Sequence, residues 1–168
     1  MALLEILTWP NDRLRHVAKP VTEWSADLTT FILDMFETMY ADQGVGLAAT
    51  QVGVQKRIIV VDCGEDEPAP LVFVNPHIVH ESGQTTFAEG CLSIPGLRAE
   101  IDRVERIVVR YQTQTGTKAE MSAEGLLAIC IQHEIDHLNG LLYFDHLSEF
   151  ERKAFLQSYA DLSVEPQS

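Results

Sequence analysis

Apolar residues recur with helical spacing in three parts of the chain. Between residues 25 and 40 they return every three or four positions, which predicts an amphipathic helix with Ser25 as its N-cap. Residues 126–131 are apolar almost all round, so we expect the helix that they begin to be buried and to stop at Asn139-Gly140. A third helix is expected to begin at Ser148.

Short β-branched runs and alternating segments predict strands. Residues 58–61 and 71–74 form continuous apolar runs, and we expect the second to end at Asn75-Pro76. Residues 106–112 alternate between apolar and polar side chains, and a turn near Gly116 is expected to fold them back as a hairpin. Strands and helices do not alternate regularly along the chain. The pattern therefore predicts an α+β fold with mostly antiparallel sheets around a central buried helix.

Composition and charge narrow the classes of function. The chain has 46% hydrophobic and 22% charged residues, as in globular proteins, and its length fits a single domain over residues 1–168. A net charge of −13 argues against direct nucleic-acid binding, which needs clustered Lys and Arg. No apolar run reaches the roughly 18 residues that span a membrane. Without a signal-peptide pattern, we expect a cytoplasmic protein with reduced cysteines at positions 63, 91 and 130.

The segment HEIDH at residues 133–137 carries the most specific chemistry. On a helix, His133 and His137 lie about 40° apart around the axis, so both imidazoles can bind one metal ion. Glu134 follows the first histidine, where it can reach a water on the metal and act as general base. The alternative is a core helix with two paired histidines, but burying these charges without partners would cost several kcal/mol. Asp136 is expected to brace neighbouring structure rather than bind the ion.

A catalytic metal normally has three protein ligands, and two cysteines are candidates for the third. Cys130 lies three residues before His133 on nearly the same helical face. Cys91 lies far away in the segment EGCLS, beside a glycine that lets the backbone approach a metal. Spacing alone does not choose between them. For Cys63 and Cys130 we favour a role as small core residues. The histidines at positions 16, 77, 80 and 146 lack ligand spacing and are expected to be exposed.

Three segments resemble the signatures of peptide deformylases, namely GVGLAATQ at residues 44–51, EGCLS at 89–93 and QHEIDHL at 132–138. They occur in the order found in that family, with spacing typical of its bacterial branch. The likeness runs from about residue 3 to residue 147. It implies a metal-dependent hydrolase that removes the N-formyl group from the N-terminal formyl-methionine of newly made polypeptides and releases formate.

The resemblance also implies a role for individual residues. The metal ligands would be Cys91, His133 and His137. Glu134 would take a proton from water and pass it to the departing amine, while the Gln51 side chain and the Leu92 backbone N–H would hold the oxyanion. The residues implied at the pocket for the methionine side chain are Val45, Gly46, Leu126, Ile129 and Cys130, for which ordinary core packing is the alternative.

The metal implied by the resemblance is Fe²⁺, with Zn²⁺, Ni²⁺ or Co²⁺ as substitutes. Ligand chemistry alone would instead have suggested zinc for a Cys-His-His set. The implied partners are N-formyl-Met peptides and nascent chains, and we expect a monomer that has no membrane partner.

Some deformylases are thought to dock on the ribosome through a basic C-terminal helix. Here residues 147–168 carry four acids and two bases, which predicts weak ribosome docking. The same segment has an apolar stripe that is expected to pack on the domain or on a partner protein, formed by Phe150, Phe155, Leu156 and Tyr159.

Two rival functions share parts of this pattern. A zinc endopeptidase also uses a helical HExxH, but has no need of a glycine-flanked cysteine and the GVGLAATQ segment. A non-catalytic binding module could keep the fold. Intact Glu134, Gln51 and three candidate ligands weigh against it.

Overall fold

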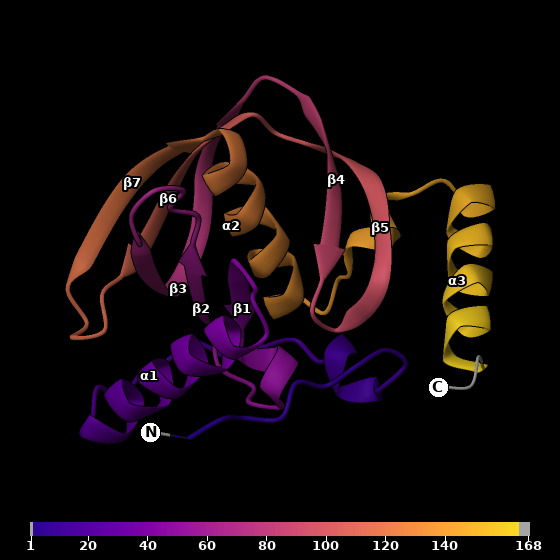
Figure 1. The fold of residues 1–168 in the computed structure, drawn as a ribbon. Coiled ribbons are helices and arrows are strands. Elements are labelled where there is room, and N and C mark those ends of the chain that lie inside the picture. The colour runs from indigo at the N-terminus through magenta and orange to yellow at the C-terminus, as the bar shows by residue number, and fades with distance from the viewer. Residues whose placement is uncertain (1, 165–168) are drawn as a thin grey trace.

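The computed structural model describes residues 2–164 (Figure 1). The helices are α1 (Ala26–Ala41), α2 (Gly125–Leu138) and α3 (Glu149–Val164), with short 3-10 helices η1 (Asp12–Arg15), η2 (Ala49–Val52) and η3 (Tyr143–His146). The strands are β1 (Gly46–Ala48), β2 (Ile58–Asp62), β3 (Pro70–Ser82), β4 (Thr85–Cys91), β5 (Ile94–Arg103), β6 (Arg106–Gln112) and β7 (Lys118–Glu124).

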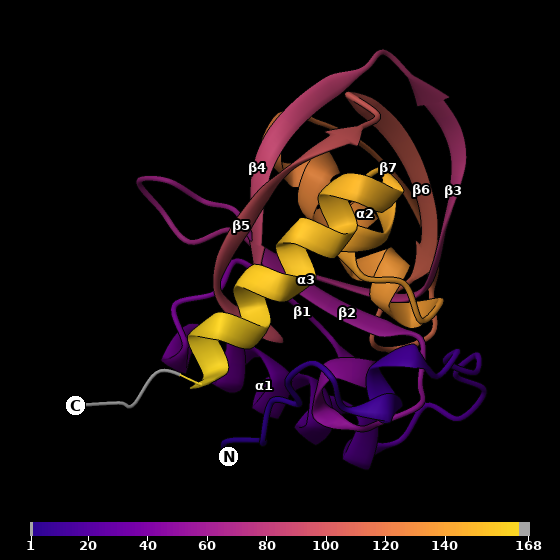
Figure 2. The same ribbon diagram turned by 90° about the vertical axis from the view of Figure 1, so that its right-hand side faces the viewer.

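The strands form two antiparallel sheets with α2 between them. The larger sheet has the order β1-β2-β3-β6-β7, and the smaller one pairs β4 with β5. Figures 1 and 2 show α2 enclosed by the two sheets, with α1 beneath the larger sheet and α3 outside β5. This arrangement confirms the predicted α+β class and the central position of the buried helix.

The larger sheet is covered on both faces, which explains the continuous apolar run in β2. Ile59 and Val61 pack in the core shared with α2, whereas Ile58 and Val60 pack in the core shared with α1. Successive strand side chains point to opposite faces, so a strand with both faces buried must be apolar at every position. The predicted hairpin of β6 and β7 is also present.

Helix α2 ends where the sequence predicts. Asn139 is its C-cap, and Gly140 follows with a φ of 75°, in the left-handed region that favours glycine. A Cβ atom at Gly140 would also clash with the Arg15 carbonyl oxygen. The glycine thus ends the helix directly after His137 and lets the N-terminal segment pack closely against that end.

The structure corrects the predicted end of β3. The strand continues past Asn75-Pro76 to Ser82, with a register shift against β6 between Val74 and His77. Asn75 adopts a φ of 50°, and its side-chain amide bonds the Val21 backbone and Gln112. Turn residues such as Asn75 and Pro76 would be expected to end a strand. Here the side-chain hydrogen bonds of Asn75 stabilise an irregular position, and the strand continues.

Helix α3 packs against β5 and η3 through most of the predicted apolar stripe (Figure 2). Phe155, Leu156 and Tyr159 lie in a cluster with Ile94 and Tyr143. Phe150 does not belong to this packed face, because 83% of it is exposed. None of the helices between residues 2 and 164 is long and apolar enough to cross a membrane.

Candidate metal centre

Cys91, at the end of β4, meets two histidines on successive turns of α2. The ligand atoms of Cys91, His133 and His137 all lie within 4.8 Å of one another, and Cys91 Sγ is 3.3 Å from His137 Nε2. Within residues 2–164 this is the one group of at least three such side chains that could hold a metal ion. The geometry therefore brings Cys91, and not Cys130, to the histidine pair.

Glu134 lies beside this group in a site with little room to spare. Its side chain is buried, and its Oε2 atom would be only 2.5 Å from a Cβ atom placed on Gly46. Burial raises the pKa of Glu134 to about 7. A carboxyl group with such a pKa can accept and return a proton near neutral pH, as general acid–base chemistry requires.

Two buried polar atoms at this centre have no hydrogen-bond partner within the described part of the chain, Glu134 Oε1 and His137 Nδ1. Burying such groups without partners is costly unless water or a substrate meets them. Because His137 Nε2 faces Cys91, an ion at the ligand group would be bound by Nε2 and would not contact Nδ1. One thiol and two imidazoles also form a donor set typical of zinc and iron sites. The residues present therefore fit a metal ion with an adjacent water.

The two histidines differ in their electrostatic surroundings. Burial, followed by the charge of His133, lowers the pKa of His137 well below its ordinary value, which favours the neutral imidazole that binds metals. Burial alone would also lower the pKa of His133. A hydrogen bond with Cys91, the charge of Glu134 and a hydrogen bond with Glu89 outweigh it and raise that pKa.

Glu89 orients His133 from behind. Its Oε1 atom is 2.8 Å from His133 Nδ1, and its carboxylate is also bound by both Nε and Nη2 of Arg103 at 2.7 and 2.8 Å. Burial raises the pKa of Glu89, but the hydrogen bonds from Arg103 and His133 outweigh it and lower the pKa. A carboxylate that binds Nδ1 leaves Nε2 free for a metal. Such a carboxylate is a usual hydrogen-bond partner of a histidine that binds a metal.

Gln51 is held with its amide nitrogen toward the centre. Its Oε1 atom accepts a hydrogen bond from the Ala48 backbone N–H at 2.9 Å, so its Nε2 atom must point the other way. That nitrogen is 3.0 Å from Ser93 Oγ and 3.6 Å from Cys91 Sγ. Leu92 follows Cys91 directly and lines the cleft that opens from this centre.

The centre opens into a cleft of about 750 Å³. The five predicted pocket residues all line it, namely Val45, Gly46, Leu126, Ile129 and Cys130, and Phe87 lines it as well. Val45 and Leu126 are 46% and 37% exposed, so they lie at its rim, whereas Ile129 and Cys130 are buried. Cys130 also belongs to the core cluster against which Cys63 packs, as predicted for two small core residues.

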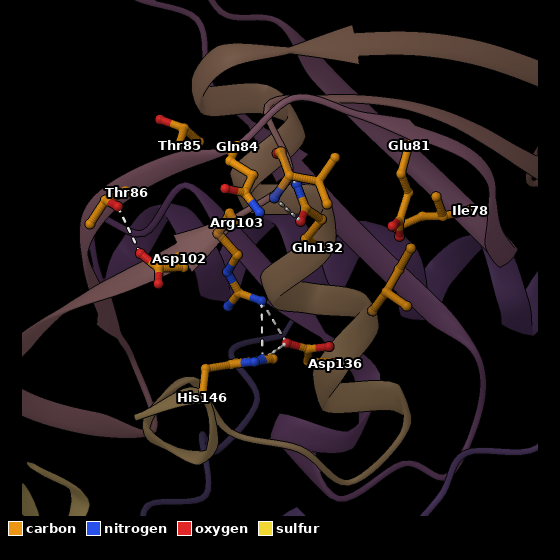
Figure 3. A pocket seen from close by; sticks show the side chains of 12 residues that line it. Ile78, Glu81, Gln84, Thr85, Thr86, Asp102, Arg103, Gln132, Asp136 and His146 are labelled. Atoms are coloured by element: carbon orange, nitrogen blue, oxygen red, sulfur yellow. Dashed lines mark hydrogen bonds and ion pairs between the residues drawn. The ribbon is translucent and has the colours of Figure 1, made fainter. Parts of the chain in front are cut away.

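Sequence reasoning missed the residues that support the ligands. Arg103 and Glu89 received no role, and His146 was expected to be exposed. His146 is exposed as predicted, but its Nε2 atom nevertheless lies 2.8 Å from Asp136 Oδ2 (Figure 3). Asp136 also binds Arg103 at 2.7 Å, so it braces structure as predicted. No spacing rule could have found these contacts, because the partners come from four different elements.

The chain is similar to known proteins over almost its whole length. The family model described as polypeptide deformylase matches residues 3–153. A peptide deformylase of Tolumonas auensis is 47% identical over 163 residues, which cover 97% of this chain and 98% of that protein. Two solved structures are also similar, a peptide deformylase from Legionella pneumophila (TM-score 0.88, 44% identity, 98% and 100% coverage) and one from Ehrlichia chaffeensis in complex with actinonin (TM-score 0.90, 40% identity, 98% and 100% coverage).

Proposed function

Because this chain belongs to the polypeptide deformylase family, we propose that Cys91, His133 and His137 hold the metal ion on which its activity depends. The chain is an enzyme that removes the N-formyl group from newly made polypeptides. The observation that carries the residue assignment is the convergence of one sulfur and two imidazole nitrogens within 4.8 Å beside a buried glutamate.

The proposed metal is Fe²⁺, with Zn²⁺, Ni²⁺ or Co²⁺ as substitutes. The donor set suits both iron and zinc, so the preference for iron rests on family resemblance. When bound, the ion supplies a Lewis acid that lowers the pKa of water and polarises a carbonyl oxygen. The chain itself contributes the proton transfer, the further hydrogen bonds and the shape of the cleft.

Glu134 is the proposed general base and acid. Its unpartnered Oε1 atom is available to take a proton from the attacking water, and a pKa of about 7 allows the same carboxyl group to return that proton to the departing amine. Gly46 lets the β1 backbone approach the carboxylate closely. The formyl group to be removed and the Glu134 carboxylate are thereby confined to one narrow part of the cleft.

Gln51 and Leu92 are the proposed hydrogen-bond donors to the formyl oxygen as it gains negative charge. The Gln51 amide is fixed in orientation by Ala48 and Ser93, so its second N–H group, which points toward Cys91 Sγ, is already directed at the centre. One such donor is typically worth about 10²–10³-fold in rate. The Leu92 backbone N–H would complete the pair.

The cleft is proposed to receive the methionine side chain next to the formyl group. Ile129 and Cys130 offer buried apolar surface, and Val45 and Leu126 offer exposed apolar surface at the rim. A formyl group carries only hydrogen beyond its carbonyl. The crowding of Glu134 against Gly46 therefore favours formyl over bulkier acyl groups.

We also propose that the protein is a cytoplasmic monomer with weak ribosome docking. The two bases of α3, Arg152 and Lys153, lie among acids, and Lys153 pairs with Glu149 at 3.3 Å. Few phosphates can be neutralised by such a surface.

A substrate comparison tests the proposed function. Protein purified without oxygen and loaded with Fe²⁺ is expected to release formate from a formyl-Met peptide and to leave a blocked, formyl-free peptide of the same sequence intact. Cleavage of internal peptide bonds in the blocked peptide would instead support the rival endopeptidase. Metal binding without either reaction would support a binding module.

A further inference from the structure

A second cavity lies against a different face of α2 from the one that carries the metal centre. It has a volume of about 510 Å³ and is lined by Gln132 and Asp136 of α2, Arg103 of β5 and His146 of η3. We call it the side pocket. Figure 3 shows the Arg103, Asp136 and His146 side chains converging there.

A continuous chain of polar contacts connects the side pocket with the metal centre. It begins at His133 Nδ1, which is 2.8 Å from Glu89 Oε1, and continues through the two bonds between Glu89 and Arg103. Arg103 Nη1 is then 2.7 Å from Asp136 Oδ2, and His146 Nε2 is 2.8 Å from the same oxygen. His146 is therefore the last member of this chain of contacts, and Asp136, Arg103 and Glu89 lie between it and His133.

Burial changes steadily along this chain of contacts. The side chains of Arg103 and Glu89 are 3% and 4% exposed, that of Asp136 is 18% exposed and that of His146 is 37% exposed. Arg103 is a buried cation whose two carboxylate partners must both stay in place. Glu89 is held from inside by His133. Asp136, which borders the side pocket, depends on the donor that His146 supplies.

We propose that His146 is a positioning residue for the metal centre, acting through Asp136, Arg103 and Glu89 on the orientation of His133. Its Nε2 atom is 3.3 Å from Arg103 Nη1 but only 2.8 Å from Asp136 Oδ2, so donation to the carboxylate is the closer contact. This donation holds Asp136 against Arg103, and Arg103 fixes the carboxylate that bonds to His133. The proposal rests on the proposed role of His133 as a ligand.

Two substitutions at one position separate a hydrogen-bond role from simple packing. His146→Leu removes the donor, whereas His146→Gln keeps an N–H group at similar reach. His77→Leu is the matched control, because His77 is an exposed histidine of β3 outside the side pocket. Each variant is loaded with Co²⁺ as a spectroscopic probe. The measurements are the visible ligand-field spectrum, the rate of Co²⁺ release to a chelator, and kcat and KM for a formyl-Met peptide.

We expect His146→Leu to shift the Co²⁺ spectrum, release the ion faster and lower kcat with little change in KM. The expected size is about 3- to 10-fold, below the 10- to 100-fold typical of a direct partner of a ligand. His146→Gln should recover most of each loss, and His77→Leu should match the unsubstituted protein.

Two results would overturn the proposal. One is a folded His146→Leu protein with an unchanged spectrum and unchanged Co²⁺ release. The other is a His146→Gln protein as impaired as His146→Leu, because the hydrogen bond would then not be the cause. Failure of the proposed function is distinguishable, since the unsubstituted protein would then release no formate while the spectrum and Co²⁺ release still report on His146.

Discussion

The two polar faces of α2 differ in how their buried groups are satisfied. On the metal face, Glu134 Oε1 and His137 Nδ1 are buried without a hydrogen-bond partner among residues 2–164. On the side-pocket face, Asp136 is bound by Arg103 and His146, and Gln132 is bound by the Val104 backbone. One helix thus carries an incomplete polar site and a completed network less than one turn apart.

This difference separates residues that act on a ligand from residues that hold the structure. Unpaired buried groups cost free energy, so an open group such as Glu134 Oε1 is tolerated where water and a substrate supply the missing contact. A paired ionic network, in contrast, becomes strongly destabilising when one partner is removed. Substitutions on the metal face should change chemistry with little loss of stability. Those on the side-pocket face should mainly lower stability and should act on the chemistry only indirectly, through the orientation of His133.

The largest effect is expected for Cys91→Ser. A hydroxyl group is a poor neutral replacement for a thiolate ligand, so this variant should lose or greatly weaken its metal and lose its activity while it remains folded. Metal content per chain after gel filtration, with a circular dichroism spectrum as folding control, measures the outcome.

Cys130→Ser is the matched control for that experiment. Cys130 lines the cleft but does not belong to the ligand group, so its variant should keep the metal. A modest loss of stability or substrate affinity is expected from a polar group in an apolar site. Full metal content in Cys91→Ser together with none in Cys130→Ser would reverse the ligand assignment.

Arg103→Leu should be the most destabilising change on the side-pocket face. It leaves the buried Glu89 carboxylate and the half-buried Asp136 carboxylate without their shared cation, which should cost about 3–5 kcal/mol in free energy of unfolding. Denaturant unfolding of the variant and the unsubstituted protein at pH 7 measures the difference. A loss below about 1 kcal/mol, the range of surface ion pairs, would contradict this view of the network.

The same network predicts a pH dependence. Burial raises the folded-state pKa of both Glu89 and Asp136, but the hydrogen bonds and charges of Arg103, His133 and His146 outweigh it and lower the pKa of each. Their stabilising contribution is therefore present above the ordinary carboxyl pKa of about 4. It is lost as the pH falls through the lowered folded-state values. The stability gap between the unsubstituted protein and Arg103→Leu should therefore narrow as the pH falls, and a gap that widens in acid would contradict the pairing.

The smallest effect is expected from α3 on ribosome binding. Truncation after Leu147 removes two bases and their neighbouring acids, so co-sedimentation with ribosomes should be weak before and after truncation across a salt series. Because Phe155 and Tyr159 pack on the body of the protein, a substitution of both bases by glutamine is the better-folded companion variant. Tight, salt-dependent binding that either change abolishes would show that the charge argument is wrong.

Periodicity predicted α1, α2 and the β6–β7 hairpin because their patterns are local and unbroken. It missed β4 and β5, where Gly90 and Pro95-Gly96 interrupt alternation and the register shifts between Glu89 and Cys91. Each of these two strands is stabilised by pairing with the other strand more than by the β propensity of its own residues. This omission mattered, because β4 carries Cys91 and Glu89 to α2.

The site, like the fold, was predictable from the sequence where it depends on local spacing and not where it depends on contacts between distant residues. The i,i+4 histidines and Glu134 follow from helical geometry alone, but spacing left Cys91 and Cys130 as alternatives. Glu89 and His133 are 44 positions apart, and Arg103 and Asp136 are 33 apart, so the supporting network exists only in the folded chain. Resemblance implied roles for the groups at the candidate metal centre and was silent on those behind them.

Formate release by Glu134→Gln, with its metal content measured on the same sample, tests most directly whether Glu134 transfers the proton at this centre. We expect one metal ion per chain, near-native stability, and a rate on a formyl-Met peptide reduced by about 10²–10⁴-fold, since only proton transfer is removed. A metal-loaded variant with turnover close to that of the unsubstituted protein would contradict the role of Glu134 at the Cys91–His133–His137 centre.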